Sequence, residues 1–333
     1  MSTYQPPFVI TPLILNQVIE VGELMGHWAA MAGRASPLLR KENRIRTIQA
    51  SLAIEHNSLT TEQVTALMEG KRILAPAKDI QEVRNAILAY EKMSEWKSEK
   101  LSDLLQAHRV LMLGLVDNPG QFRTGNVGVY REKQLIHMAP PASQVFRLMN
   151  DLLGWLKTTE LHPLIAGAVF HYEFEFIHPF ADGNGRMGRL WQTLILREWR
   201  SELAWLPVET LIHYQQDRYY QVLGQCDRQS SCTPFIEFIL ENIISALQEG
   251  LGKSSALSEE MSEEMSEEMS PDLLDIEKRI LQILSNHPGR SAKSIADECE
   301  LSARTVERYL KALQLKGKLQ RVGATKGGMW RLL

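Results

Sequence analysis

The stretch HPFADGNGRMGRL, residues 178–190, holds three glycines, two arginines, a histidine and an aspartate. Apolar residues at helical spacing precede it in HPLIAGAVFHYEFEFI (162–177) and follow it in GRLWQTLILREWRSEL (188–203), which predicts a helix, a loop and a second helix. A purely structural helix start would not gather three helix-weakening glycines. The sequence therefore predicts a loop that holds a ligand at the start of the second helix.

The ligand that suits this loop is an anion. Backbone N–H groups at a helix N-terminus are unpaired, and the helix dipole favours negative charge there. Gly183 and Gly185 allow a tight turn and a close approach of the backbone, and Asn184 adds a side-chain donor. These features predict a nest of N–H groups for the phosphates of a nucleotide.

Charged residues around the nest supply further chemistry. Asp182 offers the one carboxylate that, together with phosphate oxygens, can hold Mg²⁺. Arg186 and Arg189 are three residues apart on one helix face, and both can bind phosphate oxygens. His178 titrates near neutral pH and is the natural base for an incoming hydroxyl. The stretch lacks the Lys-Ser/Thr ending of a P-loop and the closing acid of a calcium loop.

The motif resembles that of the Fic domain family. HPFADGNGRMGR matches the pattern HPFx(D/E)GNGRxxR at every defined position. Its surroundings are also similar: FRTGNVGVYREKQLIHMAPP (122–141), which predicts a β-hairpin, and QQDRYYQVL (215–223). Most members transfer AMP from ATP onto a protein hydroxyl. The resemblance implies a mainly α fold class: a Fic-type helical domain with an inserted β-hairpin flap.

The resemblance also implies a role for each residue of the motif. His178 would take the proton from a target Ser, Thr or Tyr, Asp182 would bind Mg²⁺, and ATP would be the substrate. Arg186 would add charge on the phosphates, and Arg189 would hold the γ-phosphate. The anion hole would consist of Gly183, Asn184 and Gly185.

Two further sites follow from the resemblance. Tyr219 and Tyr220 match the place where the family packs adenine, although such an aromatic pair is usually part of the core. Residues 124–139 resemble the flap, which pairs with the backbone of a target protein as an added strand; otherwise the hairpin only covers the core. The docking residues expected on the flap are Val127, Val129, Ile136 and His137.

An inhibitory helix is expected at SLAIEHNSLT, residues 51–60. Ser51 and Glu55 are four apart and share a helix face. They resemble the family's inhibitory pattern of Ser or Thr, three residues, Glu, and then Gly or Asn, although His56 stands at the last position and Asn57 follows it. Glu55 would pair with Arg189 and misalign the α-phosphorus, so we expect a nearly silent protein. The same carboxylate could orient a water that removes AMP.

The C-terminal region has a different pattern. The repeat SEEMSEEMSEEMS predicts an acidic, solvated linker that is transiently helical at most. Beyond it, three helices with a short CELS link and two strands around a glycine turn predict a winged helix-turn-helix (α+β) domain. Arg304, Arg308 and Lys311 follow helical spacing on the helix that would enter a major groove, which predicts DNA binding. Other winged helices bind proteins or dimerise.

Composition sets broader limits. The 333 residues suffice for roughly two domains, and a net charge of −3 argues against a wholesale nucleic-acid binder. Three cysteines, an N-terminus without a signal-peptide pattern and no apolar run long enough to span a membrane predict a cytoplasmic protein without membrane contact. The expected parts are an N-terminal helical region (1–110), a catalytic core (111–250), a linker (251–271) and a winged helix (272–333).

The interpretation is therefore a protein adenylyltransferase, autoinhibited by Glu55 and also self-modifying. We expect a protein substrate docked on the flap and a homodimer. Alternatives within the family are transfer of phosphate by a reversed nucleotide, transfer of UMP, or removal of AMP. An alternative of another class is a DNA-binding regulator whose Fic domain senses nucleotide without catalysis, against which the intact His178 argues.

Overall fold

The computed structural model describes residues 4–32, 37–131, 134–267, 271–299, 301–315, 318–322 and 329–332. The chain divides into two compact units, Met1–Ser254 and Ser255–Leu333. Helices dominate both units, and each contains one two-stranded sheet among its described residues, so the predicted fold class is confirmed. No helix within these ranges has both the length and the apolar character needed to cross a membrane.

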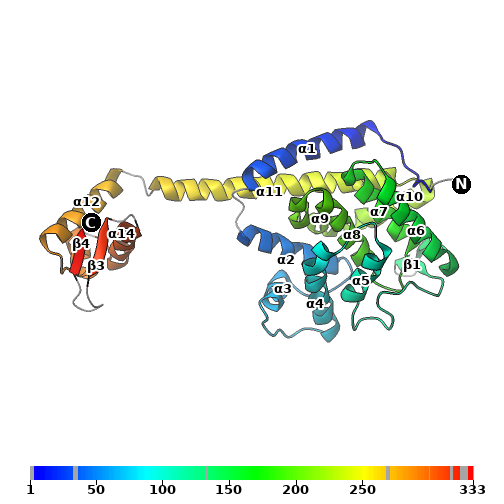
Figure 1. The fold of residues 1–333 in the computed structure, drawn as a ribbon, viewed down its shortest axis with the longest axis horizontal. Coiled ribbons are helices and arrows are strands. Elements are labelled where there is room, and N and C mark those ends of the chain that lie inside the picture. The colour runs from blue at the N-terminus through cyan, green and yellow to red at the C-terminus, as the bar shows by residue number, and fades with distance from the viewer. Residues whose placement is uncertain are drawn as a thin grey trace. The chain divides into compact units, whose positions relative to one another are not determined.

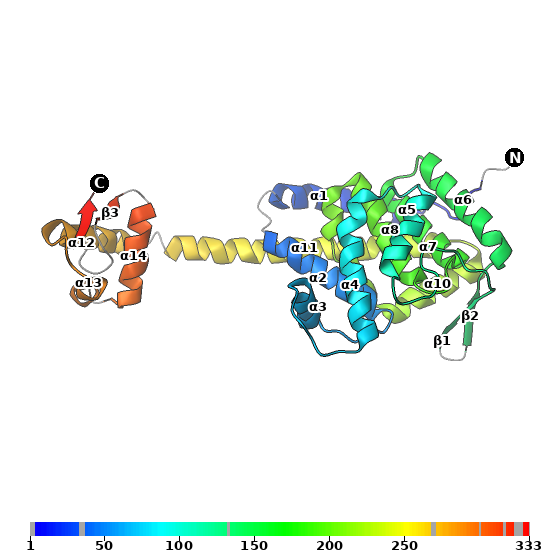
Figure 2. The ribbon, with the colours of Figure 1, turned by 60° about the horizontal axis from the view of Figure 1, so that its bottom comes forward.

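The first unit is a cluster of helices with a two-stranded hairpin at its edge (Figures 1 and 2). Its helices are α1 Pro12–Ala32, α2 Pro37–Ala53, α3 Thr61–Met68, α4 Ala77–Lys92, η1 Met93–Glu95, α5 Leu101–Leu111, α6 Ala142–Thr158, α7 Pro163–Ile177, α8 Asn184–Trp199, η2 Ser201–Trp205, α9 Val208–Tyr214, α10 Gln216–Gln229 and α11 Thr233–Glu267. The hairpin consists of β1 Gly128–Arg131 and β2 Gln134–Met138.

Helices α7 and α8 form the centre of this unit and pack on each other. Both are buried around most of their circumference, because apolar residues such as Phe170, Phe174 and Trp191 cover more than one face. Helix α8 also contacts α2 and α5, and Figures 1 and 2 show the other helices arranged around the pair. This packing fixes the positions of both helix ends that meet at residues 178–183.

The loop between α7 and α8 is closed at each end by a left-handed residue. His178 ends α7 with φ 51°, and Gly183 caps α8 with φ 86°. A Cβ at Gly183 would lie 2.6 Å from Sδ of Met112, so both the dihedral and the space require glycine. The loop therefore has one tightly fixed path above the N-terminus of α8.

The hairpin predicted within residues 122–141 is present. Its strands are antiparallel, pairing Gly128 with Met138 and Arg131 with Gln134, with a register shift between Val129 and Tyr130. It is inserted between α5 and α6, so both of its ends return to the helical body.

The second unit is a winged helix. It contains α12 Pro271–Asn286, α13 Ala292–Cys299, α14 Ala303–Leu315, and the antiparallel strands β3 Leu319–Val322 and β4 Met329–Leu332. Its own core includes Leu284, Ile295, Val306 and Trp330. The N–H of Trp330 donates to the carbonyl of Pro288, which ties β4 to the turn after α12.

The linker differs from the expected solvated chain. Helix α11 continues to Glu267 and includes most of the Ser-Glu-Glu-Met repeat. Glu and Met have high helix propensity, so the repeat can extend a helix that the first unit has nucleated. The first unit supplies that start, because Gln17 Nε2 of α1 donates to the carbonyl of Glu237 on α11 at 3.1 Å.

Substitution of Gly188 tests the close packing of α7 on α8. A Cβ there would lie 2.8 Å from Oε1 of Glu175 and 2.9 Å from Cδ2 of His171, both on α7. We expect Gly188→Ala to lower the free energy of unfolding by about 1–3 kcal/mol through overpacking. Gly154→Ala on α6, where nothing lies within 4 Å, should instead be neutral or stabilising, because alanine favours a helix. Calorimetry of both variants checks this; equal stability would contradict the tight α7–α8 packing.

Candidate active site

His178 lies at the end of α7 and is only partly buried. Burial lowers the pKa of its imidazole to about 4, and the positive charges of His137 and Arg123 act in the same direction. The carbonyl of Glu175 and the carboxylate of Glu55 oppose this shift. At neutral pH the imidazole is therefore unprotonated and can accept a proton.

The anion nest differs from expectation at Asn184. Its Nδ2 donates to the carbonyl of Phe180, and its Oδ1 accepts from the N–H of Phe180, both at 2.9 Å. The side-chain donor that we assigned to a phosphate is thus used to fold the loop. The N–H groups expected to bind phosphate are consequently those of the first residues of α8, from Asn184 onward, because the N–H of Gly183 already donates to Oδ1 of Asp182.

The side chain of Glu55 lies against the N-terminus of α8. A Cβ on Gly185 would collide with Oε1 of Glu55, so the carboxylate sits directly over the nest. Oε1 also accepts a hydrogen bond from Nη2 of Arg189 at 2.7 Å. The ion pair predicted between these two residues is present, and a negative charge occupies the place expected for phosphate.

Arg189 is a buried cation with partners on α2. Its Nε donates to Oγ of Ser51 at 3.1 Å, and its Nη2 donates to the carbonyl of Ser51 at 2.9 Å. Burial would lower the pKa of Arg189, but the carboxylate of Glu55 and the hydroxyls of Tyr219 and Tyr220 together raise the pKa above its ordinary value. Ser51 and Glu55 together therefore hold the guanidinium charge.

The position of His56, where the inhibitory pattern has Gly or Asn, has a distinct backbone conformation. His56 adopts a left-handed conformation with φ 66°, which glycine and asparagine tolerate better than other residues. This accounts for Gly or Asn at the last position of the inhibitory pattern. Asn57 has a separate role, because its Nδ2 donates to the carbonyl of Asp79 and to Oε2 of Glu82.

Arg186 is paired with two carboxylates. Its Nη1 donates to Oε1 of Glu82 on α4 at 3.0 Å, and its Nη2 donates to Oδ1 of Asp182 at 3.1 Å. The Arg186 and Glu82 side chains are each about 5% exposed. Glu82 was not found from the sequence, since it belongs to no motif and lies 104 positions away from Arg186.

Asp182 fits a magnesium ion that is bound together with a nucleotide. Its side chain is 54% exposed, and its Oδ1 accepts from the N–H of Gly183. Within the described residues, no three His, Cys, Asp or Glu side chains form a metal-binding group. A single carboxylate with phosphate oxygens suits Mg²⁺, which keeps several waters and seldom uses an all-protein cage.

His108 supports the motif loop from behind and was also missed. Its Nδ1 accepts from the N–H of Gly120 at 2.8 Å, so the proton lies on Nε2, which faces the carbonyl of Asp182 at 3.0 Å. The ring stacks on Phe180 with centroids 3.6 Å apart. Burial lowers the pKa of His108 to about 4, so the neutral form persists.

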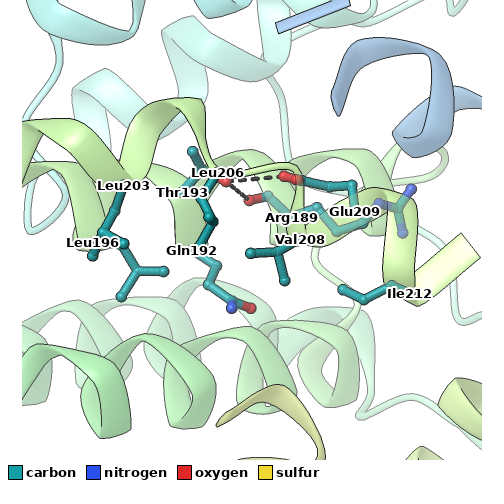
Figure 3. Close-up of a pocket in the computed structure, with 9 residues that line it drawn as sticks. All are labelled: Arg189, Gln192, Thr193, Leu196, Leu203, Leu206, Val208, Glu209 and Ile212. Atoms are coloured by element: carbon teal, nitrogen blue, oxygen red, sulfur yellow. Dashed lines mark hydrogen bonds between the residues drawn. The ribbon is translucent and has the colours of Figure 1, made fainter. Parts of the chain in front are cut away.

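A small, mostly apolar cavity lies behind Arg189 (Figure 3). Oγ1 of Thr193 donates to the carbonyl of Arg189 or to Oε1 of Glu209, both at 3.0 Å. Burial raises the pKa of Glu209 to about 7, although hydrogen bonds to its carboxylate oppose the shift. We assign this cavity to the support of Arg189, because its other walls are apolar residues such as Leu196, Leu206 and Ile212.

The structure corrects the adenine assignment at Tyr219. This side chain is 1% exposed and packs among Phe235 and Phe238, and its hydroxyl lies 3.1 Å from Nε2 of His171. It is a core residue, with no ring face open to a ligand. Tyr220, in contrast, lines a hollow of about 430 Å³ with Tyr172, Glu175, Phe176, Leu223, Gly224, Asp227 and His137.

The flap residues divide into three groups. Val127 lines an open cleft of about 1010 Å³ beside Ala181 and Asp182. His137 faces the protein body instead of a target: its Nε2 lies 2.8 Å from the carbonyl of Phe176 and its Nδ1 lies 2.9 Å from Oδ2 of Asp227. The remaining docking residues have side chains outside the described part of the chain: Val129 and Ile136.

In the second unit, α14 carries the expected DNA contacts. Lys311 is exposed on this helix. The side chains of Arg304 and Arg308 lie outside the described residues, although their backbone belongs to the same helix.

Comparison with known proteins identifies the family. Residues 98–196 match the Fic/DOC family model. The chain is 46% identical to a Fic family protein from Desulfovibrio desulfuricans whose crystal structure is known, with a TM-score of 0.75, over 99% of this chain and 98% of that one. The chain belongs to the Fic/DOC family. Residues 273–320 also match the winged helix-turn-helix DNA-binding model.

Curated relatives of this Fic chain carry the name protein adenylyltransferase Fic. One from Nematostella vectensis is 30% identical over 60% of this chain and 47% of its own length. Another from Drosophila virilis is 30% identical over 70% of this chain and 48% of its own length. The chain thus spans about half the length of these relatives.

Removal of the Glu82 carboxylate tests whether Arg186 of the motif needs its partner on α4. Glu82→Ala leaves the buried Arg186 with only the partly exposed Asp182, and breaking a buried ion pair costs about 3–5 kcal/mol. We expect a loss of unfolding free energy near that range, measured by calorimetry. Glu69→Ala is the matched control, because its ion pairs with Lys41 and Lys71 are at the surface. Equal stability of the two variants would show that Arg186 does not need Glu82.

Proposed function

We propose that this protein is an adenylyltransferase that moves AMP from ATP onto a hydroxyl of a target protein. The observation that carries the proposal is the arrangement at the α7–α8 loop. There an unprotonated His178 stands beside a helix N-terminus with Arg186 and Arg189 on its first turns. The name of the curated relatives, protein adenylyltransferase, supports the same activity.

The chemistry follows from these positions. His178 accepts the proton of the target hydroxyl as its oxygen attacks the α-phosphorus and pyrophosphate leaves. The N–H groups of α8 and the two arginines stabilise the negative charge on the phosphates. Asp182 would hold Mg²⁺, which neutralises phosphate charge when bound. Most of the catalysis is therefore positioning of reactants.

For the base of the nucleotide, we propose the hollow beside Tyr220. It has an exposed aromatic wall in Phe176 and an apolar wall in Leu223, which suit a flat purine. The acidic edge formed by Glu175 and Asp227 favours a base that presents N–H donors, as the amino group of adenine does. Tyr220 thus replaces the Tyr219–Tyr220 pair as the adenine contact.

We further propose that Glu55 keeps the enzyme inactive. Its carboxylate holds Arg189, the residue expected to bind the γ-phosphate, and covers Gly185 in the nest. A nucleotide that binds beside it cannot bring all three phosphates into place. Removal of the carboxylate frees both the arginine and the helix N-terminus.

Labelling with ATP tests the activity and its inhibition together. We expect the wild-type chain with Mg²⁺ and α-labelled ATP to modify itself slowly, and Glu55→Gly to do so much faster. Adding His178→Ala to that variant should lower transfer by about 10²–10⁴-fold, the usual contribution of a general base. Calorimetry should show that ATP still binds, because His178 contacts the hydroxyl and not the phosphates.

Other outcomes would select the alternatives. Protein labelled only from γ-labelled ATP would identify a kinase. Transfer from UTP in preference to ATP would identify UMP transfer. Loss of label from a premodified protein, dependent on Glu55, would identify removal of AMP. Equal activity of Glu55→Gly and wild type would contradict the inhibitory role.

DNA binding is a second candidate function, which the winged helix-turn-helix match and the exposed Lys311 support. We expect the full chain to bind duplex DNA in fluorescence anisotropy, with affinity that falls steeply as salt is raised. Arg308→Glu on α14 should abolish binding, whereas Lys97→Glu in the first unit should not. If the full chain does not bind at low salt, this unit binds a protein or dimerises instead.

The cellular setting and assembly remain predictions. Cys226, Cys232 and Cys299 are all free, which suits a reducing cytoplasm. A homodimer and a protein substrate on the flap are expected from the family resemblance alone.

A further inference from the structure

We propose that Arg123 is a positioning residue that fixes the flap and the catalytic histidine relative to each other. The inference rests on the proposed function, because it concerns how His178 and a target on the flap would meet. Arg123 lies in the sequence GQFRTG before the hairpin and was not singled out by any motif. It is 6% exposed.

The hydrogen bonds of Arg123 join two parts of the site. Its Nη1 donates to the carbonyl of Gly125, just before β1, and its Nη2 donates to the carbonyl of Pro140, just after β2. Its Nε donates to the carbonyl of His178 at 2.8 Å, and Nη2 also reaches the carbonyl of Ile177 at 3.3 Å. One planar guanidinium thus holds both ends of the hairpin against the residue that bears the base.

The backbone of Arg123 adds a fifth connection. Its N–H donates to the carbonyl of Pro179 at 2.9 Å, so three successive carbonyls, at residues 177–179, are bonded to this one arginine. These carbonyls follow the end of α7, where no further helical N–H groups are available to them. Lysine could not make these contacts, because a single ammonium lacks the fixed fork of donors.

The backbone conformation of His178 explains why these hydrogen bonds from Arg123 are needed. His178 has a left-handed backbone with φ 51°, which is unfavourable for a residue other than glycine. Strain of this kind persists at functional sites only when surrounding contacts enforce it. The bond from Arg123 Nε to the carbonyl of His178 is such a contact, and it sets the direction of the imidazole.

Arg123 also contributes its charge. The hydrogen-bond acceptors of its guanidinium among the described residues are backbone carbonyls, and burial lowers the pKa of Arg123. The charged groups that face His178 are Arg123, His137 on β2 and Glu55 after α2. Burial is the main cause of the lowered pKa of His178, and the two cations add to it, so Arg123 orients the base and also favours its unprotonated form.

The test uses the full chain in the Glu55→Gly background, where transfer can be measured. We expect Arg123→Lys to lower the rate of AMP transfer by about 10²-fold, since small misplacements of reacting groups have effects of this size. The dissociation constant for ATP, measured by calorimetry, should stay unchanged. Added guanidinium ion should restore part of the activity of Arg123→Ala but not of the background enzyme.

The pH profile separates charge from structure. Without the charge of Arg123 the pKa of His178 rises, so the rate of Arg123→Ala should fall off at a higher pH than that of the background enzyme. Arg123→Lys keeps a positive charge, and its profile should have the same acidic limb with a lower plateau. A merely structural role would lower the plateau in both variants and move neither limb.

Controls keep this inference distinct from the proposed function. Arg147→Lys, on the exposed face of α6, should behave as the background enzyme. If Glu55→Gly itself transfers no AMP, the proposed function fails. Hydrogen exchange then tests whether Arg123 still holds the hairpin and the loop together: Arg123→Lys should speed exchange at residues 124–128, 137–140 and 177–183 but not elsewhere. Normal transfer in Arg123→Lys, or unchanged exchange at both the hairpin ends and the loop, overturns the inference.

Discussion

The ion pair between Arg189 and Glu55 is the interaction on which the arrangement of the site depends. Arg189 is buried on all sides, so its charge requires a carboxylate and oriented oxygens around it. Ser51 and Glu55 of the N-terminal region provide them, and the hydroxyl of Thr193, which also contacts Glu209, lies against the backbone carbonyl of Arg189. The need to satisfy one cation thereby joins α2 to α8, which lies far from it in sequence.

A second buried ion pair, between Arg186 and Glu82, likewise joins α8 to the N-terminal helices. Arg186 donates a hydrogen bond to Glu82 on α4. Glu82 also accepts a hydrogen bond from Asn57, which lies two residues after Glu55. Each phosphate-binding arginine expected from the motif is therefore already neutralised by an acid from the N-terminal helices. In this arrangement those helices complete the charge balance of the catalytic loop, and they are not an appendage to it.

The sequence predicted the parts of the site that are close together in the chain. The loop of residues 178–189, the hairpin and the winged helix each have a local pattern, such as clustered glycines or periodic apolar residues. Glu55 was found only because its pattern resembles a known inhibitory helix. Glu82, His108 and Arg123 were missed because their partners are distant backbone carbonyls or single charges, which leave no local periodicity. Asn184 and Tyr219 were misjudged because residue type does not tell which way a side chain turns.

The position of Glu55 on the same chain as Arg189 has a consequence for how the site responds to its surroundings. A tethered carboxylate acts at an effective concentration that does not depend on how much protein is present. Under the proposed inhibition, the phosphates of ATP would have to displace a carboxylate whose local concentration is fixed. Anything that lengthens or loosens the connection between α2 and α8 lowers that local concentration directly. The left-handed turn at His56, immediately after Glu55, is where a single substitution can change it without altering any residue of the motif.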